Sequence, residues 1–275
     1  AAMLRCCSAV TLLILSVALA PAQEPPEALR IRQLLASDQP AEALAAARDW
    51  SLAHPADVEA LAVYARLQAQ LGQFDGALDA LDSLYFLTRD VQVLVDKGET
   101  LLDWGRDEEA RRAFQDALHR RESYAPAYAG LARAMLERKQ YTEADAACEV
   151  ALRIDERCVS ALLVAARLEA ARGNLSAASE VLSRAAQVAP MAAEVTLWRG
   201  HLEALQGRLD GAQRYWREYV RQAPGSLAAW QLARGLYPLA LGPHPCPGYY
   251  PAFSPDGQWL AYRGRGDSGS VYVSR

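Results

Sequence analysis

The sequence predicts an all-α solenoid, a row of stacked helical hairpins. The first observation is a series of alanines spaced 33 or 34 residues apart: Ala43, Ala77, Ala110, Ala144, Ala178 and Ala212. A single methyl group at a fixed interval indicates that two helices approach closely, and a period near 34 is typical of stacked hairpins. The second observation is composition, because Ala, Leu, Arg and Glu dominate up to about residue 236 and favour helix.

Other positions keep step with these alanines when each alanine is position 20 of a 34-residue unit. Position 15, between the two helices, is mostly glycine, which tolerates the left-handed conformation that ends a helix. Position 8 is mostly small and position 24 is apolar, while proline at position 32 ends the second helix. Position 15 is Gly72, Gly105, Gly173 and Gly207, with Asp38 and Lys139 in the other two units, and position 8 is Ala65, Gly98, Ala132, Ala166 and Gly200, with Ile31 in the first unit. Position 24 is Ala47, Leu81, Phe114, Cys148, Leu182 and Trp216, and position 32 is proline at Pro55, Pro190 and Pro224.

These residues resemble the tetratricopeptide repeat, in six units from about Glu24 to Ser226. The resemblance implies a right-handed solenoid of about six hairpins. Residues 227–236 predict a capping helix, so that the solenoid spans residues 24–236. Pro25 and Pro26 predict a shortened first helix. The interval from Ala77 to Ala110 is 33 residues instead of 34, and we expect the least regular stacking of the repeats at residues 83–91.

The first 22 residues have the pattern of a secretory signal peptide. Arg5 precedes the apolar run at residues 9–20, and Ala20-Pro21-Ala22 favours cleavage after Ala22. The run is too short for a comfortable membrane span. We therefore expect an exported protein in the periplasm or on the outer surface of a bacterium. A membrane contact is expected only in the alternative case of an uncleaved segment.

The composition changes after Gly235. Residues 237–250 are rich in proline and glycine and predict an extended linker. Residues 251–275 predict a β-hairpin with strands at 259–263 and 270–274, preceded by the tight turn that begins at Ser254. This stretch resembles the first blade of a TolB-type (WD40-like) β-propeller. Because a propeller closes only with several blades, the resemblance implies a fragment of a longer protein.

Charge and motifs argue against several classes of function. The formal net charge of −4 and pI near 5.7 give no bulk attraction to nucleic acid. The sequence lacks a phosphate loop, a dinucleotide fingerprint and metal-ligand spacing among its histidines, so we expect no cofactor, no metal and no enzyme activity. We expect Cys148 and Cys158 to be buried and unbridged, because ten residues along mostly one helix would separate them by roughly 15 Å.

The resemblance also implies a concave wall built by the first helix of each hairpin, with positions 2, 5, 9, 12 and 13 facing a protein or peptide ligand. Four arginines at position 9 suggest recognition of an acidic or C-terminal segment through paired N–H donors. The alternative is a solvated face on which Glu59, Asp103, Glu137 and Glu194 balance the arginines. The position 9 residues are Arg32, Arg66, Glu99, Arg133, Arg167 and His201.

Two other functions are left open by the sequence. The chain could be the non-catalytic N-terminal region of a larger exported hydrolase, a peptidase, because TolB-type propellers can precede such a domain. Aromatic residues near the end of the solenoid could form a subunit interface, although core packing is the simpler interpretation. These residues are Trp198, Tyr215, Trp216 and Tyr219.

Overall fold

The structure is a computed structural model that describes residues 25–37, 39–223, 249–253, 260–263 and 271–274. The predicted signal peptide, the capping helix and the turn at Ser254 lie outside the described residues, as does nearly all of the linker. The helical repeats are almost entirely inside them.

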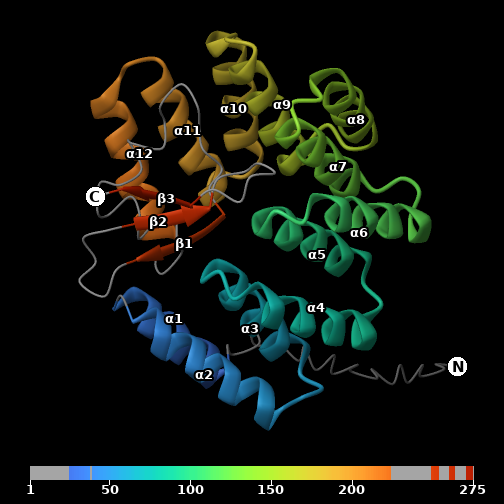
Figure 1. Cartoon of the computed structure of the whole chain (residues 1–275), viewed down its shortest axis with the longest axis vertical. Coiled ribbons are helices and arrows are strands. Elements are labelled where there is room, and N and C mark those ends of the chain that lie inside the picture. Colours follow the sequence, from blue (N-terminus) through green and yellow to red (C-terminus); the bar gives the residue numbers. More distant parts are fainter. Residues whose placement is uncertain (1–24, 38, 224–248, 254–259, 264–270, 275) are drawn as a thin grey trace, which may run out of the picture.

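Between residues 25 and 223, twelve helices pair into six hairpins that follow one another along a curve (Figure 1). All the second helices begin two residues after the turn position, and the first helices begin near position 1 of each unit. The helices are α1 Pro26–Ala36, α2 Pro40–Ala53, α3 Val58–Gln70, α4 Phe74–Thr88, α5 Val91–Trp104, α6 Asp107–Arg120, α7 Ala125–Glu137, α8 Tyr141–Ile154, α9 Val159–Ala171, α10 Leu175–Val188, α11 Ala193–Leu205 and α12 Leu209–Gln222.

The turn at position 15 adopts the left-handed backbone conformation wherever the structure describes it. The four glycines there have φ between 75° and 84°, and Lys139 has φ 61°. A side chain in this region is strained, whereas glycine adopts it freely. The predicted role of the glycines is therefore confirmed, and Lys139 shows that the turn geometry is imposed even without glycine.

The six alanines at position 20 are all fully buried, each with 0% of its surface exposed. The residues at positions 8 and 24 of each hairpin vary inversely in size. Glycine at position 8 accompanies a large ring at position 24, and a larger residue at position 8 accompanies a smaller one at position 24. Because interiors are close-packed, a small residue at position 8 leaves room for a larger one at position 24. The pairs are Ile31 and Ala47, Ala65 and Leu81, Gly98 and Phe114, Ala132 and Cys148, Ala166 and Leu182, and Gly200 and Trp216.

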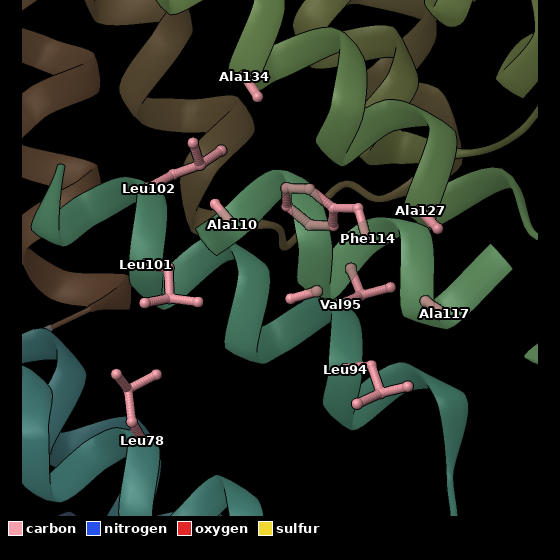
Figure 2. Close-up of a cluster of buried hydrophobic side chains, with 11 residues drawn as sticks. Leu78, Leu94, Val95, Leu101, Leu102, Ala110, Phe114, Ala117, Ala127 and Ala134 are labelled. Atoms are coloured by element: carbon pink, nitrogen blue, oxygen red, sulfur yellow. The ribbon is translucent and has the colours of Figure 1, made fainter. Parts of the chain in front are cut away.

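Phe114 is at the centre of the middle cluster, which joins α4, α5, α6 and α7 (Figure 2). Its ring is fully buried and lies against two glycines from different helices. A Cβ atom on Gly98 would lie 2.4 Å from the ring, and one on Gly130 would lie 2.3 Å from it. Two successive repeats are thus locked together around one aromatic side chain.

The irregular repeat junction lies where the 33-residue interval predicts it. Helix α4 is one residue longer than the other second helices, and it ends at Arg89 in the left-handed conformation with φ 54°. Only Arg89 and Asp90 then separate α4 from α5, whereas four residues link the other hairpins. The first helix, α1, has 11 residues and is shorter than the other first helices, as its prolines predict.

The two cysteines are buried free thiols, as predicted, but the geometric reason for their separation is wrong. Helix α8 ends at Ile154, so Cys158 lies beyond it, at the N-cap position of α9. The chain reverses between them, and both side chains belong to one hydrophobic cluster. Cys148 Sγ donates a hydrogen bond to the backbone oxygen of Ala161, 3.3 Å away.

The described residues after the solenoid form three short strands. They are β1 Tyr249–Phe253, β2 Leu260–Arg263 and β3 Val271–Ser274, paired antiparallel in the order β1-β2-β3. Ala261 is opposite Val273 in the second pair.

The first helices of successive hairpins pack against one another, with contacts between α5 and α7, α7 and α9, and α9 and α11. The second helices pack mainly on the first helices of their own and the following hairpin. Because the first helices are closer together, they form the inner wall of the curve. Strand β1 contacts α5, so part of this wall lies against the chain's own C-terminal strands.

Candidate functional site

The six residues at position 9 occupy equivalent places on α1, α3, α5, α7, α9 and α11. Their environments differ. Arg32 and Arg66 are exposed, and Glu99, Arg133 and Arg167 are half-buried. The sixth, His201, is buried, with 5% of its surface exposed. The wall therefore does not present a uniform row of arginines.

Arg133 on α7 is paired with two carboxylates of the preceding repeat. Its guanidinium donates to Glu99 and, at a distance of 2.5 Å, to Asp103 Oδ1, both on α5. Burial lowers the pKa of Arg133, but Glu99, Asp103 and Glu137 raise it more, and the result lies well above the ordinary value. Arg133 therefore fastens α7 to α5 as a permanent cation.

Arg167 on α9 repeats this arrangement one unit later. It pairs with Glu137 on α7, and its guanidinium carbon lies 4.8 Å from the centre of the Trp198 ring on α11. Arg133 and Asp103 are 30 residues apart, and so are Arg167 and Glu137. Position 9 of one repeat thus pairs with position 13 of the repeat before it.

This register explains why Arg66 differs from Arg133 and Arg167. In the repeat that precedes Arg66, the residue at position 13 is Ala36, which cannot form an ion pair. Arg66 has no ion-pair partner in the described part of the chain, and its charge acts on Asp96 of α5. Burial raises the pKa of Asp96, against the opposing effects of a hydrogen bond from Gln92 and the charge of Arg66.

His201 is part of an aromatic cluster between α11 and α12. Its ring meets Trp198 edge-on, with ring centres 4.9 Å apart, and Trp216 at 6.1 Å. Burial, together with the charge of Arg167, lowers the pKa of His201 to about 4. The residue is therefore a neutral core side chain near pH 7, and Trp198 and Trp216 pack within this cluster.

A carboxylate from α11 reaches the same region as the Arg133 pairs. Glu194, at position 2 of the last repeat, has an exposed side chain. Desolvation raises its pKa, Glu99 and Asp103 raise it further, and Arg133 opposes them. The pKa of Glu194 on α11 is thus affected by charged groups of α5 and α7.

Within the described residues, no group of three or more histidine, cysteine or acidic side chains is arranged to hold a metal ion. No helix in those same residues has the length and hydropathy that a membrane span requires.

The tetratricopeptide repeat family matches this sequence twice, over residues 95–157 and 163–226. These two segments are tetratricopeptide repeats. The matches cover the hairpins that contain Arg133, Arg167 and His201. A comparison with curated proteins finds no match.

Solved tetratricopeptide-repeat structures resemble the chain in fold. A thermophilic tetratricopeptide-repeat protein of Thermus thermophilus is 21% identical with a TM-score of 0.53, and the match covers 66% of this chain and 100% of that one. A tetratricopeptide-repeat protein from Parabacteroides merdae is 16% identical with a TM-score of 0.45, covering 76% of this chain and 84% of that one. The first likeness supports the fold alone.

In its described helical part the chain is thus an all-helical solenoid of twelve helices, of which residues 95–157 and 163–226 match the tetratricopeptide repeat. Proteins of this fold are generally non-catalytic scaffolds that bind protein partners. The balancing carboxylates at Asp103 and Glu137 form ion pairs with the arginines in the structure, and they can be found in the sequence by the 30-residue interval. The contact between Arg167 and Trp198 had no such signal in the sequence.

Proposed function

We propose that this protein is a non-catalytic interaction scaffold that binds a protein or peptide segment along the inner wall of its solenoid. The observation that carries the proposal is a tetratricopeptide-repeat wall with charged and apolar side chains open to solvent. Arg66, Asp103, Glu194 and Leu205 all belong to first helices and are exposed.

The mechanism is recognition by a preformed surface. The ion pairs of Arg133 and Arg167 join α5, α7 and α9 before any partner arrives. A wall that is already ordered loses little conformational entropy on binding, and this improves affinity. Arg133 and Arg167 already form ion pairs with carboxylates of the wall. If the ligand segment is acidic, the arginines that bind it are therefore those of the first repeats, above all Arg66.

The test is affinity capture with a wall variant and a matched control. The wall variant combines Arg66→Glu and Leu205→Arg, both at exposed positions of first helices. The control combines Arg112→Glu and Leu209→Arg, which are also exposed but lie on second helices, so net charge and composition are the same. Quantitative mass spectrometry of captured proteins should show partners lost by the wall variant and kept by the control. Equal capture by both variants would contradict binding at the wall.

We also propose that the protein is exported and that its solenoid precedes a β-propeller. The support is the signal-like segment at residues 1–22 and the propeller-like segment at residues 251–275, joined to the solenoid by the linker at residues 237–250. Fusing residues 1–22 to an alkaline phosphatase that is active only after export tests the first point, and an inactive fusion would oppose it.

The coding sequence after Arg275 tests the second point. About six further blades followed by a nucleophile motif would favour the alternative function, the non-catalytic front of an exported peptidase. A stop codon would leave the solenoid as the functional unit.

A further inference from the structure

We infer that the first hairpin binds an amphipathic helix of a partner protein on its end face, and that this helix carries lysine or arginine residues beside an apolar stripe. The end face is the surface around the cavity between α1 and α2, the hairpin at one end of the curve (Figure 1). It is separate from the inner wall, so the inference goes beyond the proposed function and does not depend on it.

The cavity between α1 and α2 has a volume of about 460 Å³. Leu34 of α1 and Ala46 and Trp50 of α2 belong to its apolar lining, and none of its described lining residues comes from α3. Trp50 is buried, while Leu34 and Ala46 are half-buried. The end face therefore has an apolar groove between two helices.

The later hairpins show what fills a groove of this kind. The second helix of each hairpin contacts the first helix of the next one. Tyr85, at position 28 of α4, belongs to the same hydrophobic cluster as Leu101 and Ala113, which are at positions 11 and 23 of the following hairpin. Leu34 and Ala46 have these two positions in the first hairpin. The stacking interface of the solenoid thus continues onto the end face, and within the described residues no helix precedes α1 to cover it.

Charged residues around the groove decide which helix fits. Glu27, Glu42 and Asp49 line the cavity together with Arg30, and all four side chains are exposed. Glu27 is at position 4, which is uncharged in each of the five later hairpins. The carboxylate there is accordingly a feature of the end face and not of the repeat. Three carboxylates and one guanidinium group favour a helix with basic residues beside its apolar stripe.

The register of the bound helix follows from the same internal precedent. Lys97, at position 7 of α5, pairs with Asp82, at position 25 of the helix α4 that covers it, with 2.5 Å between Nζ and Oδ1. Arg30 has position 7 in the first hairpin, so a single acidic residue of the bound helix fits opposite it. In α4 this aspartate lies between Leu78 and Tyr85, the two residues that pack on the next hairpin. Apolar residues seven apart are also the spacing of a helix bound in a groove.

The experiment uses the full chain and three fluorescent alanine-based peptides of 15 residues, the length of α4. The first keeps leucine, aspartate and tyrosine in the spacing of Leu78, Asp82 and Tyr85 and has lysine at four flanking positions. The second has glutamate in place of lysine, and the third is a scrambled form of the first. In fluorescence anisotropy we expect the first peptide to bind about tenfold more tightly than either control, with a preference over the glutamate peptide that falls in salt. Equal binding of the three, including no detectable binding, overturns the inference.

A pair of matched variants assigns the binding to the end face. Ala45→Arg puts a large cationic side chain into the cavity, which the exposed Ala45 lines. The control Ala146→Arg makes the same change at the same repeat position, 22, on the exposed surface of α8. The affinity for the first peptide should fall about tenfold in Ala45→Arg and stay unchanged in Ala146→Arg. Equal affinities of the two variants overturn the assignment.

The same assay separates this inference from the proposed function and from other occupants of the groove. The wall variant should bind the first peptide as the wild type does, and a loss there would move the peptide to the inner wall and overturn the inference. Self-association that Ala45→Arg abolishes would assign the end face to a second copy of the chain. Peptide binding that requires deletion of residues 1–22 would assign it to that segment. Either result overturns the partner helix and leaves binding at the inner wall to be decided by the capture experiment.

Discussion

Gly98→Ala is the sharpest test of how the repeats are held together. In an ordinary helix this change is stabilising by about 0.5–1 kcal/mol, because glycine loses more backbone entropy on folding. Here the added methyl would lie 2.4 Å from the Phe114 ring. The ring has little room to move, because it is fully buried and also lies against the backbone of Gly130, where a Cβ atom would be only 2.3 Å from it.

The expected net effect is a loss of about 2 kcal/mol in the free energy of unfolding. Overpacking a rigid core costs typically about 1–3 kcal/mol, and the two-sided contact places this site at the upper end. The gain in helix propensity offsets about 1 kcal/mol of that cost. Urea unfolding followed by far-ultraviolet circular dichroism measures the difference.

Two further variants separate the clash from a general effect of alanine. Gly211→Ala is the control, since its methyl would meet only the carboxylate end of Glu203, which can rotate away. It should leave stability unchanged or raise it by up to about 1 kcal/mol. Adding Phe114→Leu to Gly98→Ala should restore part of the loss, with a favourable coupling of about 1 kcal/mol or more in the double-mutant cycle. A Gly98→Ala protein as stable as the wild type would refute the reasoning.

Two other predictions concern the charged and titratable groups. Because the folded pKa of His201, about 4, lies below the ordinary 6.5, the unfolded chain binds the proton first and stability falls as pH drops from about 6.5 to about 4. The loss should reach about 3 kcal/mol in urea titrations across this window, and a His201→Phe variant with the same slope would contradict it. Arg133→Gln should cost about 2 kcal/mol, because it leaves Glu99 and Asp103 without their donor. The exposed pair of Arg138 with Glu108 is the comparison, where Arg138→Gln should cost clearly less in the same assay because solvent screens the pair; equal losses would show that the inner-wall pair has no special weight.

Most of the fold can be predicted from the sequence, because the patterns that specify it lie within one hairpin or recur from one repeat to the next. The alanines of position 20 and the turn glycines recur with the repeat, so each copy supports the same interpretation of the others. The exchange of size between Gly98 and Phe114, or between Gly200 and Trp216, spans 16 residues inside one hairpin. It could have been found by comparing positions 8 and 24 unit by unit. The predicted separation of Cys148 and Cys158 was wrong because it assumed that one helix ran past Ile154, where α8 in fact ends.

Only part of the candidate site could be predicted from the sequence in this way. The six position 9 residues were placed on the correct helices, because the repeat fixes which face of each first helix turns inward. Whether an arginine there is open or paired depends on a residue of another repeat. Position 13 of the preceding repeat is Asp103 for Arg133 and Ala36 for Arg66, and this distinction decides which of the two arginines forms an ion pair there.

The sequence by itself thus determined the repeat, the helices, the turns and the buried alanine series, because each depends on residues within one hairpin or its neighbour. Only the tertiary structure decided the charge of the groove. Packing of successive first helices pairs the carboxylates of α5 with the arginine of α7, and charges on these helices affect the pKa of Glu194 on α11. Electrostatic interactions act through space over several ångströms, so their balance follows from the curve of the whole wall and not from the order of residues along the chain.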